Sequence, residues 1–195
     1  MRVLQGLLAL IVLLVVGAIA YGFTLPAKAY MERSIVIARP PAVVFEVLNG
    51  YRDFAAWSPW SRLDTAMQVR IEGPAQGVGA RYYWSSAQES VGSGSQEIVE
   101  SVPHSLIRVA LTFSGMHSRN HASYQLTPEG AGTRLVWTHE AEFGGDLIGR
   151  YFGLLLDSMV GADYERGLAQ LKAYVESRPT ETAPSTASEA PALVQ

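Results

Sequence analysis

The chain has 195 residues, of which 48% are hydrophobic and 17% are charged, and its formal net charge at pH 7 is −3. This composition supports one globular domain with a packed core. Because the net charge is slightly negative and the chain has no long basic run, nucleic acid is excluded as the main partner. The absence of cysteine excludes disulfides, a thiolate nucleophile and a sulfur-ligated metal.

The first element is an apolar segment, residues 3–23, in which no residue carries a formal charge. As a helix it would be about 30 Å long, which matches the hydrocarbon core of a bilayer. Ala27-Lys28-Ala29 after Pro26 resembles a signal-peptide cleavage site, but the apolar segment is longer than that of most signal peptides. We expect residues 1–29 to be a retained membrane anchor and linker, with a cleaved signal peptide as the alternative.

The orientation of this anchor follows from its short N-terminal tail. Such a tail before a first apolar segment usually stays in the cytoplasm, although basic residues flank this segment on both sides. We therefore expect a single-pass membrane protein whose domain lies on the non-cytoplasmic side, periplasmic or extracellular.

Strand and short-helix signals follow the anchor. "MERSIVIA", residues 31–38, predicts a strand that ends at Pro40 and Pro41. Pro41 is suited to the first turn of a helix, which continues through "AVVFEVLNG" to Gly50. "YRDFAAW" predicts a second helical turn, which Pro59 ends because proline cannot continue the hydrogen-bond ladder.

Six further strands are predicted, mostly joined by short turns rich in glycine. They are residues 67–72, 80–86, 95–102, 106–113, 117–126 and 133–143. Residues 67–72 alternate strictly, with Met67, Val69 and Ile71 on one face, so we expect this strand to be half-buried. Together with residues 31–38, the pattern predicts a seven-stranded antiparallel meander.

A long helix is predicted from Asp146 to about Ser177. Its helically spaced apolar residues are Ile148, Phe152, Leu155 and Met159, then Tyr164, Leu168, Leu171 and Val175. A helix of about 45 Å crosses a whole sheet, and a curved sheet around it buries both apolar faces in an α+β fold. The space between sheet and helix is the candidate site.

Four glycines fall within this helix, at Gly149, Gly153, Gly161 and Gly167. Each lowers helix stability by about 1 kcal/mol relative to alanine. They indicate either a close approach of helix to sheet or a thin segment that moves to admit a ligand.

After the helix, residues 177–195 are rich in Pro, Ser, Thr and Ala and predict a disordered tail, which leaves residues 30–176 as the folded domain.

Five stretches, in this chain order, carry a family resemblance: "FAAWSPWSRLD", "GPAQGVGARYYW", "VGSGSQEIVESVP", "YQLTPEGAGTRLVWT" and "GLLLDSMVGADYERGLAQLKAYVES". Over residues 30–176 the chain resembles the START-like superfamily and, within it, the bacterial polyketide cyclase/dehydrase-like SRPBCC proteins. The resemblance implies the helix-grip fold and a cavity that binds hydrophobic or amphipathic molecules. Only some members catalyse a reaction, so the resemblance does not decide whether this chain is an enzyme.

Alternation along the predicted strands indicates which side chains face the cavity. We expect the ligand to contact Trp57, Trp60, Tyr82, Trp84, Leu111, Phe113, Asn120, Tyr124, Trp137, His139, Phe152, Leu155 and Met159. For Trp57 and Trp60 the alternative is that they pack their loop onto the core, with each indole N–H bonded to a nearby carbonyl. His139 is a ligand contact, a proton donor or a structural residue at the edge of the lining.

Signals for catalysis and for metals are weak. The chain has no G-x-S-x-G motif, so the catalytic residues are unknown. On a strand, His117 and His121 would lie about 13 Å apart, too far to share one ion, so we expect no metal and no cofactor. Glu140 and Glu142 alternate with inward-facing residues, so we expect them to face solvent.

The sequence therefore favours a membrane-anchored binding protein for a small hydrophobic or amphipathic ligand, either a lipid or an aromatic metabolite. One alternative is an enzyme of polyketide cyclase or dehydratase type, in which His139 transfers protons with help from Tyr124 or Asn120. Another is a protein-interaction module like the chaperone-activator branch of the superfamily. The sequence identifies no protein partner.

Overall fold

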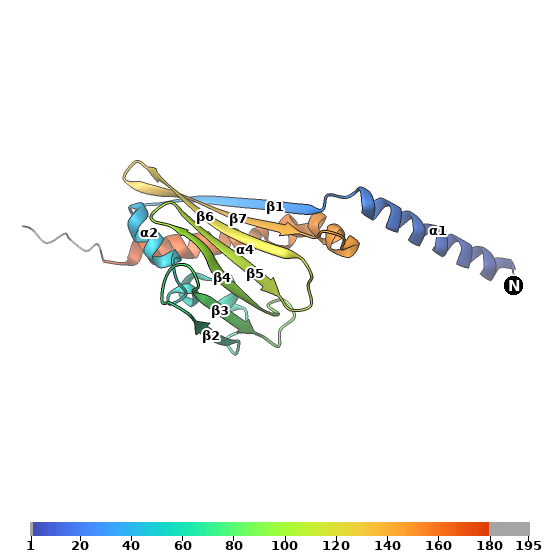
Figure 1. Ribbon diagram of the computed structural model, residues 1–195, viewed down its shortest axis with the longest axis horizontal. Coiled ribbons are helices and arrows are strands. Elements are labelled where there is room, and N and C mark those ends of the chain that lie inside the picture. The colour runs from blue at the N-terminus through green and yellow to red at the C-terminus, as the bar shows by residue number, and fades with distance from the viewer. Residues whose placement is uncertain (1, 180–195) are drawn as a thin grey trace, which may run out of the picture.

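Seven antiparallel strands form one sheet in the order β1-β7-β6-β5-β4-β3-β2, as Figure 1 shows for this computed structural model, which describes residues 2–179. The strands are β1 (Lys28–Ile37), β2 (Gln68–Glu72), β3 (Arg81–Ser85), β4 (Ser93–Val102), β5 (Leu106–Phe113), β6 (Arg119–Glu129) and β7 (Gly132–Glu142). The helices are α1 (Arg2–Thr24), α2 (Pro41–Leu48), α3 (Phe54–Trp57), the 3-10 helix η1 (Pro59–Arg62) and α4 (Leu147–Ser177). The predicted α+β helix-grip arrangement is confirmed.

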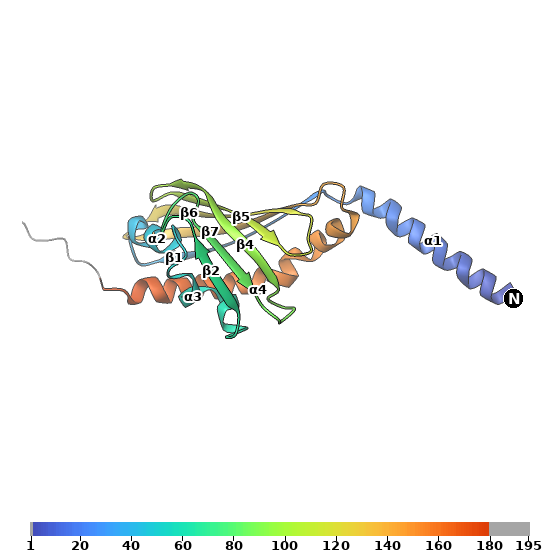
Figure 2. The ribbon, with the colours of Figure 1, turned by 60° about the horizontal axis from the view of Figure 1, so that its bottom comes forward.

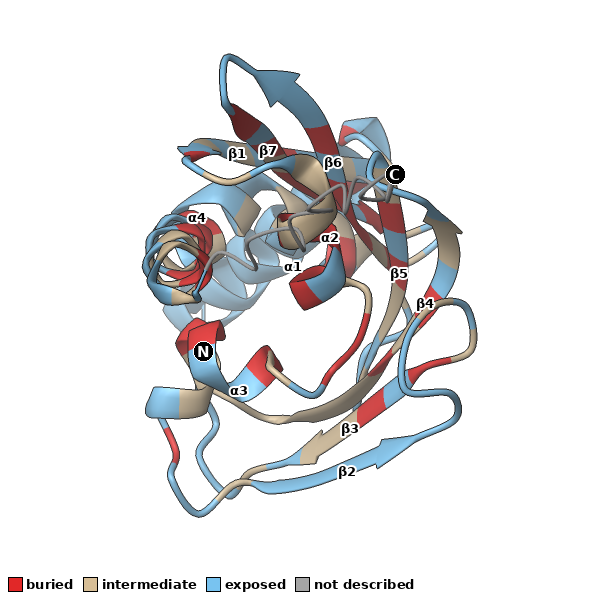
Figure 3. Ribbon diagram, turned by 90° about the vertical axis from the view of Figure 1, so that its left-hand side faces the viewer, coloured by how far each residue is buried: buried red, intermediate tan, exposed pale blue. Residues whose placement is uncertain are grey.

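Turn chemistry explains the meander from β2 to β7. In the β6–β7 hairpin Glu129 pairs with Gly132, which leaves a two-residue turn that starts at Gly130. Gly130 has a φ of 59°, which glycine adopts without steric strain. β1 then pairs with β7 along its whole length and extends the sheet beyond the meander. Figure 3 shows the resulting sheet curved around α4, α2 and α3.

The C-terminal half of α4 supplies the helical side of the core. Tyr164, Leu168, Leu171 and Val175 are all buried, as their spacing predicts. Asp146 caps the helix, because its carboxylate accepts a hydrogen bond from the Gly149 amide at 3.0 Å. The structure therefore confirms the predicted start of the helix and the apolar face of its second half.

The first half of α4 approaches the domain through its glycines. A Cβ atom added to Gly149 or Gly153 would lie 2.7 or 2.6 Å from the Phe143 ring, which is sterically forbidden. The predicted stripe of Ile148, Phe152, Leu155 and Met159 is instead exposed. Periodicity identifies an apolar stripe without showing which face of a helix packs, and here the small-residue face does. The close-approach interpretation of the glycines is confirmed.

The prediction that the strand at residues 67–72 is half-buried is wrong. β2 forms and pairs with β3 from Gln68 opposite Ser85 to Glu72 opposite Arg81, but every residue of β2 is exposed. β2 is the last strand in the sheet order, and Figure 3 shows it at the margin of the curved sheet, away from α4. Backbone pairing with β3 and cross-strand contacts such as the Arg70 guanidinium over the Tyr83 ring, at 4.2 Å, therefore hold this strand, and no other layer of the described chain covers it.

The N-terminal helix α1 is long and apolar enough to cross a membrane, and none of its most apolar 18-residue window is buried. The same length and composition fit a signal sequence. The last turns of α1 contact α4, where the Tyr151 hydroxyl donates a hydrogen bond to the Ala18 carbonyl at 2.5 Å.

At the other end of the chain, α4 ends at Ser177, and most of the tail predicted for residues 177–195 lies outside the described residues.

Gly167→Ala is expected to lower the free energy of unfolding by about 1 to 3 kcal/mol, although alanine is the better helix former. The new Cβ would lie 2.8 Å from Cζ3 of Trp137 and 3.1 Å from Cδ of Pro59, and both neighbours are rigid. In the control Gly161→Ala the nearest atom, at 2.5 Å, is Nη2 at the flexible end of Arg33, so we expect a smaller loss. Urea unfolding of the full chain in detergent micelles measures both, and equal losses would contradict this packing argument.

Candidate ligand site on the concave face

The strand register arranges the inward-facing side chains in rows across the concave face, because directly paired residues point to the same side of a sheet. The first row is Trp137, Tyr124 and Ile107, and the second is His139, Ala122, Val109 and Ile98. The third row is Ala141, Asn120, Leu111, Gln96 and Tyr82, and the fourth is Phe113, Gly94, Trp84 and Val69. The first two rows are buried throughout, whereas Phe113 and Trp84 in the fourth are partly exposed and Val69 is exposed.

Aromatic rings fill the inner half of the concave face, beneath the second half of α4. Trp137 stacks on Tyr164 with ring centroids 3.9 Å apart, and Trp57 meets Trp137 edge-on at 5.8 Å. Two hollows of about 230 and 250 Å³ occur in the described part of the chain, and these rings line neither of them. The space expected along the whole helix is therefore packed at this end, and Trp57 packs its loop onto the core.

Partly exposed apolar side chains line the outer half of the concave face, which we call the open half, although its strand residues line neither of the two hollows. Trp60, Trp84, Leu111, Leu156 and Val160 pack against the buried core, and Phe113 packs against Trp84. The Trp84 ring lies across Gly94, where an added Cβ would meet it at 2.7 Å, and its indole N–H donates to the Val91 carbonyl at 3.3 Å. Figure 2 shows that β5, whose last residue is Phe113, runs toward the side of the domain from which α1 extends.

Three polar side chains are buried in the floor of this site: Gln96, Asn120 and His139. Nδ1 of His139 lies 3.0 Å from the Tyr164 hydroxyl. Burial, with a smaller contribution from His121, lowers the pKa of His139 from 6.5 to about 4, so its imidazole is neutral at pH 7. Among the buried side chains of residues 2–179 the sole carboxylate is Asp64, which accepts a hydrogen bond from the Ser86 hydroxyl instead of facing the histidine.

Four buried polar atoms of the aromatic cluster have no hydrogen-bond partner within residues 2–179. They are the hydroxyls of Tyr51 and Tyr82 and the indole nitrogens of Trp57 and Trp137. The carbonyl partner expected for the Trp57 indole is therefore missing. Such groups are rare in folded proteins, because each loses its hydrogen bonds to water without replacement. All four can donate, and the two indoles can only donate, so their chemical complement is an oxygen acceptor.

The structure brings most of the predicted site residues to one face. Trp57, Tyr82, Asn120, Tyr124, Trp137 and His139 are buried there, and Trp60, Trp84, Leu111 and Phe113 are partly exposed. Phe152, Leu155 and Met159 lie instead on the exposed side of α4. Sequence analysis missed Gln96, which shares strand parity with Ile98, and also Leu156 and Val160, which the stronger stripe on α4 obscured. Contact of any of these residues with a ligand stays a prediction.

A curved antiparallel sheet that grips one long C-terminal helix, with an apolar concave face, defines a helix-grip ligand-binding domain of the START-like class. The family model for polyketide cyclase / dehydrase and lipid transport proteins matches residues 28–176, so the chain belongs to this SRPBCC-type family.

Solved structures with the same fold share little sequence with the chain. The Zhui aromatase/cyclase from Streptomyces sp. R1128 is 16% identical, with a TM-score of 0.58 over 76% of this chain and 94% of its own. The di-domain aromatase/cyclase BexL from the BE-7585A biosynthetic pathway is 16% identical, with a TM-score of 0.59 over 79% of this chain and 52% of its own. Protein CV1439 from Chromobacterium violaceum is 20% identical, with a TM-score of 0.53 over 76% of this chain and 98% of its own. No curated protein matches the chain in sequence.

The buried histidine makes stability depend on pH. The pKa of His139 is about 4 in the folded chain, and its ordinary value of 6.5 applies to the unfolded chain. Between pH 4 and pH 6.5 the unfolded chain therefore binds more protons than the folded chain. The free energy of unfolding is therefore expected to fall from pH 6.5 to pH 4, by up to about 3 kcal/mol from this residue. His139→Gln should remove this part of the pH dependence in urea unfolding, whereas His117→Gln, at an exposed loop position, should retain it. A variant His139→Gln with the original pH dependence would contradict the assignment.

Tyr82→Phe is expected to leave the free energy of unfolding unchanged or to raise it by up to about 1 kcal/mol, because it removes an unpartnered buried hydroxyl. The matched variant Tyr164→Phe removes a hydroxyl that bonds to His139 and should lower this free energy by about 1 kcal/mol. The same urea experiment measures both. Destabilisation of Tyr82→Phe as large as that of Tyr164→Phe would show that the Tyr82 hydroxyl has a partner in the folded chain.

Proposed function

We propose that this protein is a membrane-anchored binding protein that holds a small apolar, oxygen-bearing molecule on the open half of the concave face. One observation carries the proposal: a surface of partly exposed apolar side chains lies beside a buried aromatic cluster with unpartnered hydrogen-bond donors. Burial of apolar surface supplies most of the affinity of such a site, and a few polar groups orient the ligand.

The class of ligand follows from the lining. Trp84 and Phe113 meet edge-on with centroids 5.8 Å apart and offer flat apolar surfaces to an aromatic ring or an acyl chain. The Tyr82 ring lies 6.3 Å from Trp84, and its hydroxyl is one of the unpartnered donors. A ligand with ketone, hydroxyl or carboxyl oxygens complements these groups, which favours an aromatic metabolite or an amphipathic lipid over a plain hydrocarbon.

Helix α1 supports the membrane anchor. Its 23 residues expose their large apolar side chains on all sides, and within it only Gly22 is buried. A helix of this composition is stable in a bilayer, because its backbone is fully hydrogen-bonded and its side chains are apolar. The proposal keeps the expected orientation, with the domain on the non-cytoplasmic side of the membrane.

A second candidate function is proton transfer of cyclase or dehydratase type. The hydrogen-bonded pair of His139 and Tyr164 favours it, because a neutral imidazole can accept a proton from a bound substrate. The pKa of about 4 makes His139 a weak base, and no buried carboxylate in the described part of the chain contacts it. The binding function therefore has the stronger support.

Binding of a ketone is expected to exceed binding of the matching hydrocarbon. 9-Fluorenone and fluorene share one flat tricyclic frame, but only fluorenone has an acceptor oxygen. We expect fluorenone to shift the Trp84 indole N–H signal in the ¹⁵N spectrum of the full chain in micelles at a lower concentration than fluorene does, because its oxygen can accept a hydrogen bond from the unpartnered Tyr82 hydroxyl beside Trp84.

Two variants test the location of the bound ketone. Leu111→Ala should weaken fluorenone binding about fivefold, because it removes apolar contact area from the open half. Val36→Ala, at an exposed position on β1, should leave the binding constant unchanged. A Trp84 indole shift at the same concentration of both compounds, or equal affinities of the two variants, would contradict the proposed site.

A further inference from the structure

The first half of α4 exposes four large apolar side chains on one helical face. Ile148, Phe152, Leu155 and Met159 follow one another at intervals of four, three and four residues, and they are 52–70% exposed. We call these four residues the α4 apolar stripe. Single exposed apolar side chains are common, but a continuous row of four marks an interaction surface.

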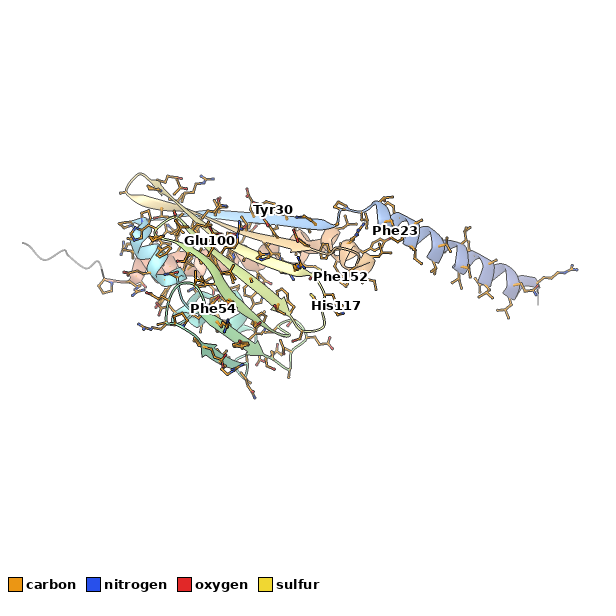
Figure 4. All side chains as sticks on the ribbon, in the orientation of Figure 1. Phe23, Tyr30, Phe54, Glu100, His117 and Phe152 are labelled. Atoms are coloured by element: carbon orange, nitrogen blue, oxygen red, sulfur yellow. The ribbon has the colours of Figure 1, made fainter. Side chains whose placement is uncertain are left out.

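Close packing of the neighbouring helical face keeps the α4 apolar stripe facing away from the sheet. The helical face beside it carries Gly149 and Gly153, which lie against the Phe143 ring too tightly to admit a Cβ atom. The helix therefore cannot roll to bury the stripe against the sheet. Figure 4 places Phe152 at the end of the domain that α1 joins, and His117 of the β5–β6 loop at the same end. Met116, beside His117, is also exposed.

The contact between α1 and α4 sets the height of the stripe relative to a membrane. The Tyr151 hydroxyl donates to the Ala18 carbonyl, and the Tyr151 ring covers Gly22. Ala18 lies six residues before the end of α1 at Thr24, which is about 9 Å along the helix axis. A bilayer that covers the apolar length of α1 therefore reaches the first turns of α4, at the level of its interfacial layer.

The side chains at this junction suit that layer. Tyr21 and Tyr151 pair with ring centroids 6.3 Å apart, and tyrosine concentrates where a membrane meets water. Arg150 donates to the carbonyls of Phe23 and Leu25, each at 3.2 Å, which fixes α4 to the end of α1. In the segment from Leu147 to Val160 the one carboxylate is Asp157, which is paired with Arg33 of β1.

We propose that the α4 apolar stripe lies in the interfacial layer of the bilayer from which α1 emerges. This second membrane contact holds the domain on the lipid surface in one orientation, with the open half of the concave face at the lipid-facing end. The inference rests on the membrane anchor of the proposed function. It adds that α4, and not α1 alone, contacts lipid.

Depth-dependent fluorescence quenching tests the inference on the full chain. Because the native chain has no cysteine, one introduced cysteine can be labelled with the environment-sensitive dye NBD at a single position. Leu155→Cys places the dye on the stripe, and Val36→Cys places it at an exposed position on β1 that is eight residues, or about 26 Å, along the strand from Lys28 and the end of α1. In phosphatidylcholine vesicles that contain lipid with a doxyl quencher near the headgroup, we expect strong quenching at position 155 and none at position 36. Equal quenching at the two positions would overturn the inference.

A third label separates failure of the inference from failure of the anchor. Leu13→Cys lies in the middle of α1, so its dye should be quenched by lipid that carries the doxyl group deep in the acyl chain. Quenching at 13 without quenching at 155 would overturn the α4 contact alone, whereas no quenching at 13 would overturn the anchor and the contact together.

A charge placed in the stripe provides an independent test. Phe152→Glu, combined with the label at position 155, should abolish the quenching there, because a carboxylate is unfavourable in the interfacial layer. The matched change Val36→Glu, at an exposed position far along β1 from α1, should leave the quenching intact. Since both positions are exposed, the fold should tolerate either change. Unchanged quenching in Phe152→Glu would contradict the inference.

Discussion

The close approach of α4 to the curved sheet is the contact on which the rest of the structure depends. Gly161 lies over the Arg33 guanidinium, which bonds to Asp157 and Glu165 of the same helix at 2.7 and 2.8 Å. One turn and a half later Gly167 lies over Trp137, whose ring stacks on Tyr164. A side chain larger than hydrogen at Gly167 would press on two rigid neighbours and move the helix away from the sheet, whereas the flexible end of Arg33 can yield at Gly161. These contacts hold α4 at a fixed height above the concave face.

That fixed height divides the concave face into two parts with different physical properties. Below the second half of α4, Trp57, Trp137 and Tyr164 fill the space and keep His139 neutral by burial. Farther out, Trp84 and Leu111 are partly exposed. The inner part supplies rigidity and unpartnered donors, while the outer part supplies apolar surface. The proposed recognition of a ligand depends on the boundary between the two.

Much of the fold was predictable because it depends on local signals. Alternation, turn glycines and the apolar spacing of Tyr164, Leu168 and Leu171 identify the strands, the meander and the covering helix. Strand parity also placed Trp137 and His139 together on the inner face. The exposure of β2 was not predictable, because alternation shows that a strand has two faces without showing whether another layer covers one. The exposed stripe on α4 escaped prediction for the same reason.

The sequence by itself determined the element order, the apolar N-terminal helix and the absence of thiol chemistry, because these follow from composition and from contacts between near neighbours in the chain. The tertiary structure alone decided which half of the concave face is filled and which glycine meets which ring. It also decided that Tyr151 reaches back to Ala18. These features join residues more than a hundred positions apart or depend on the exact volume between two layers. Neither property is encoded in any single stretch of sequence.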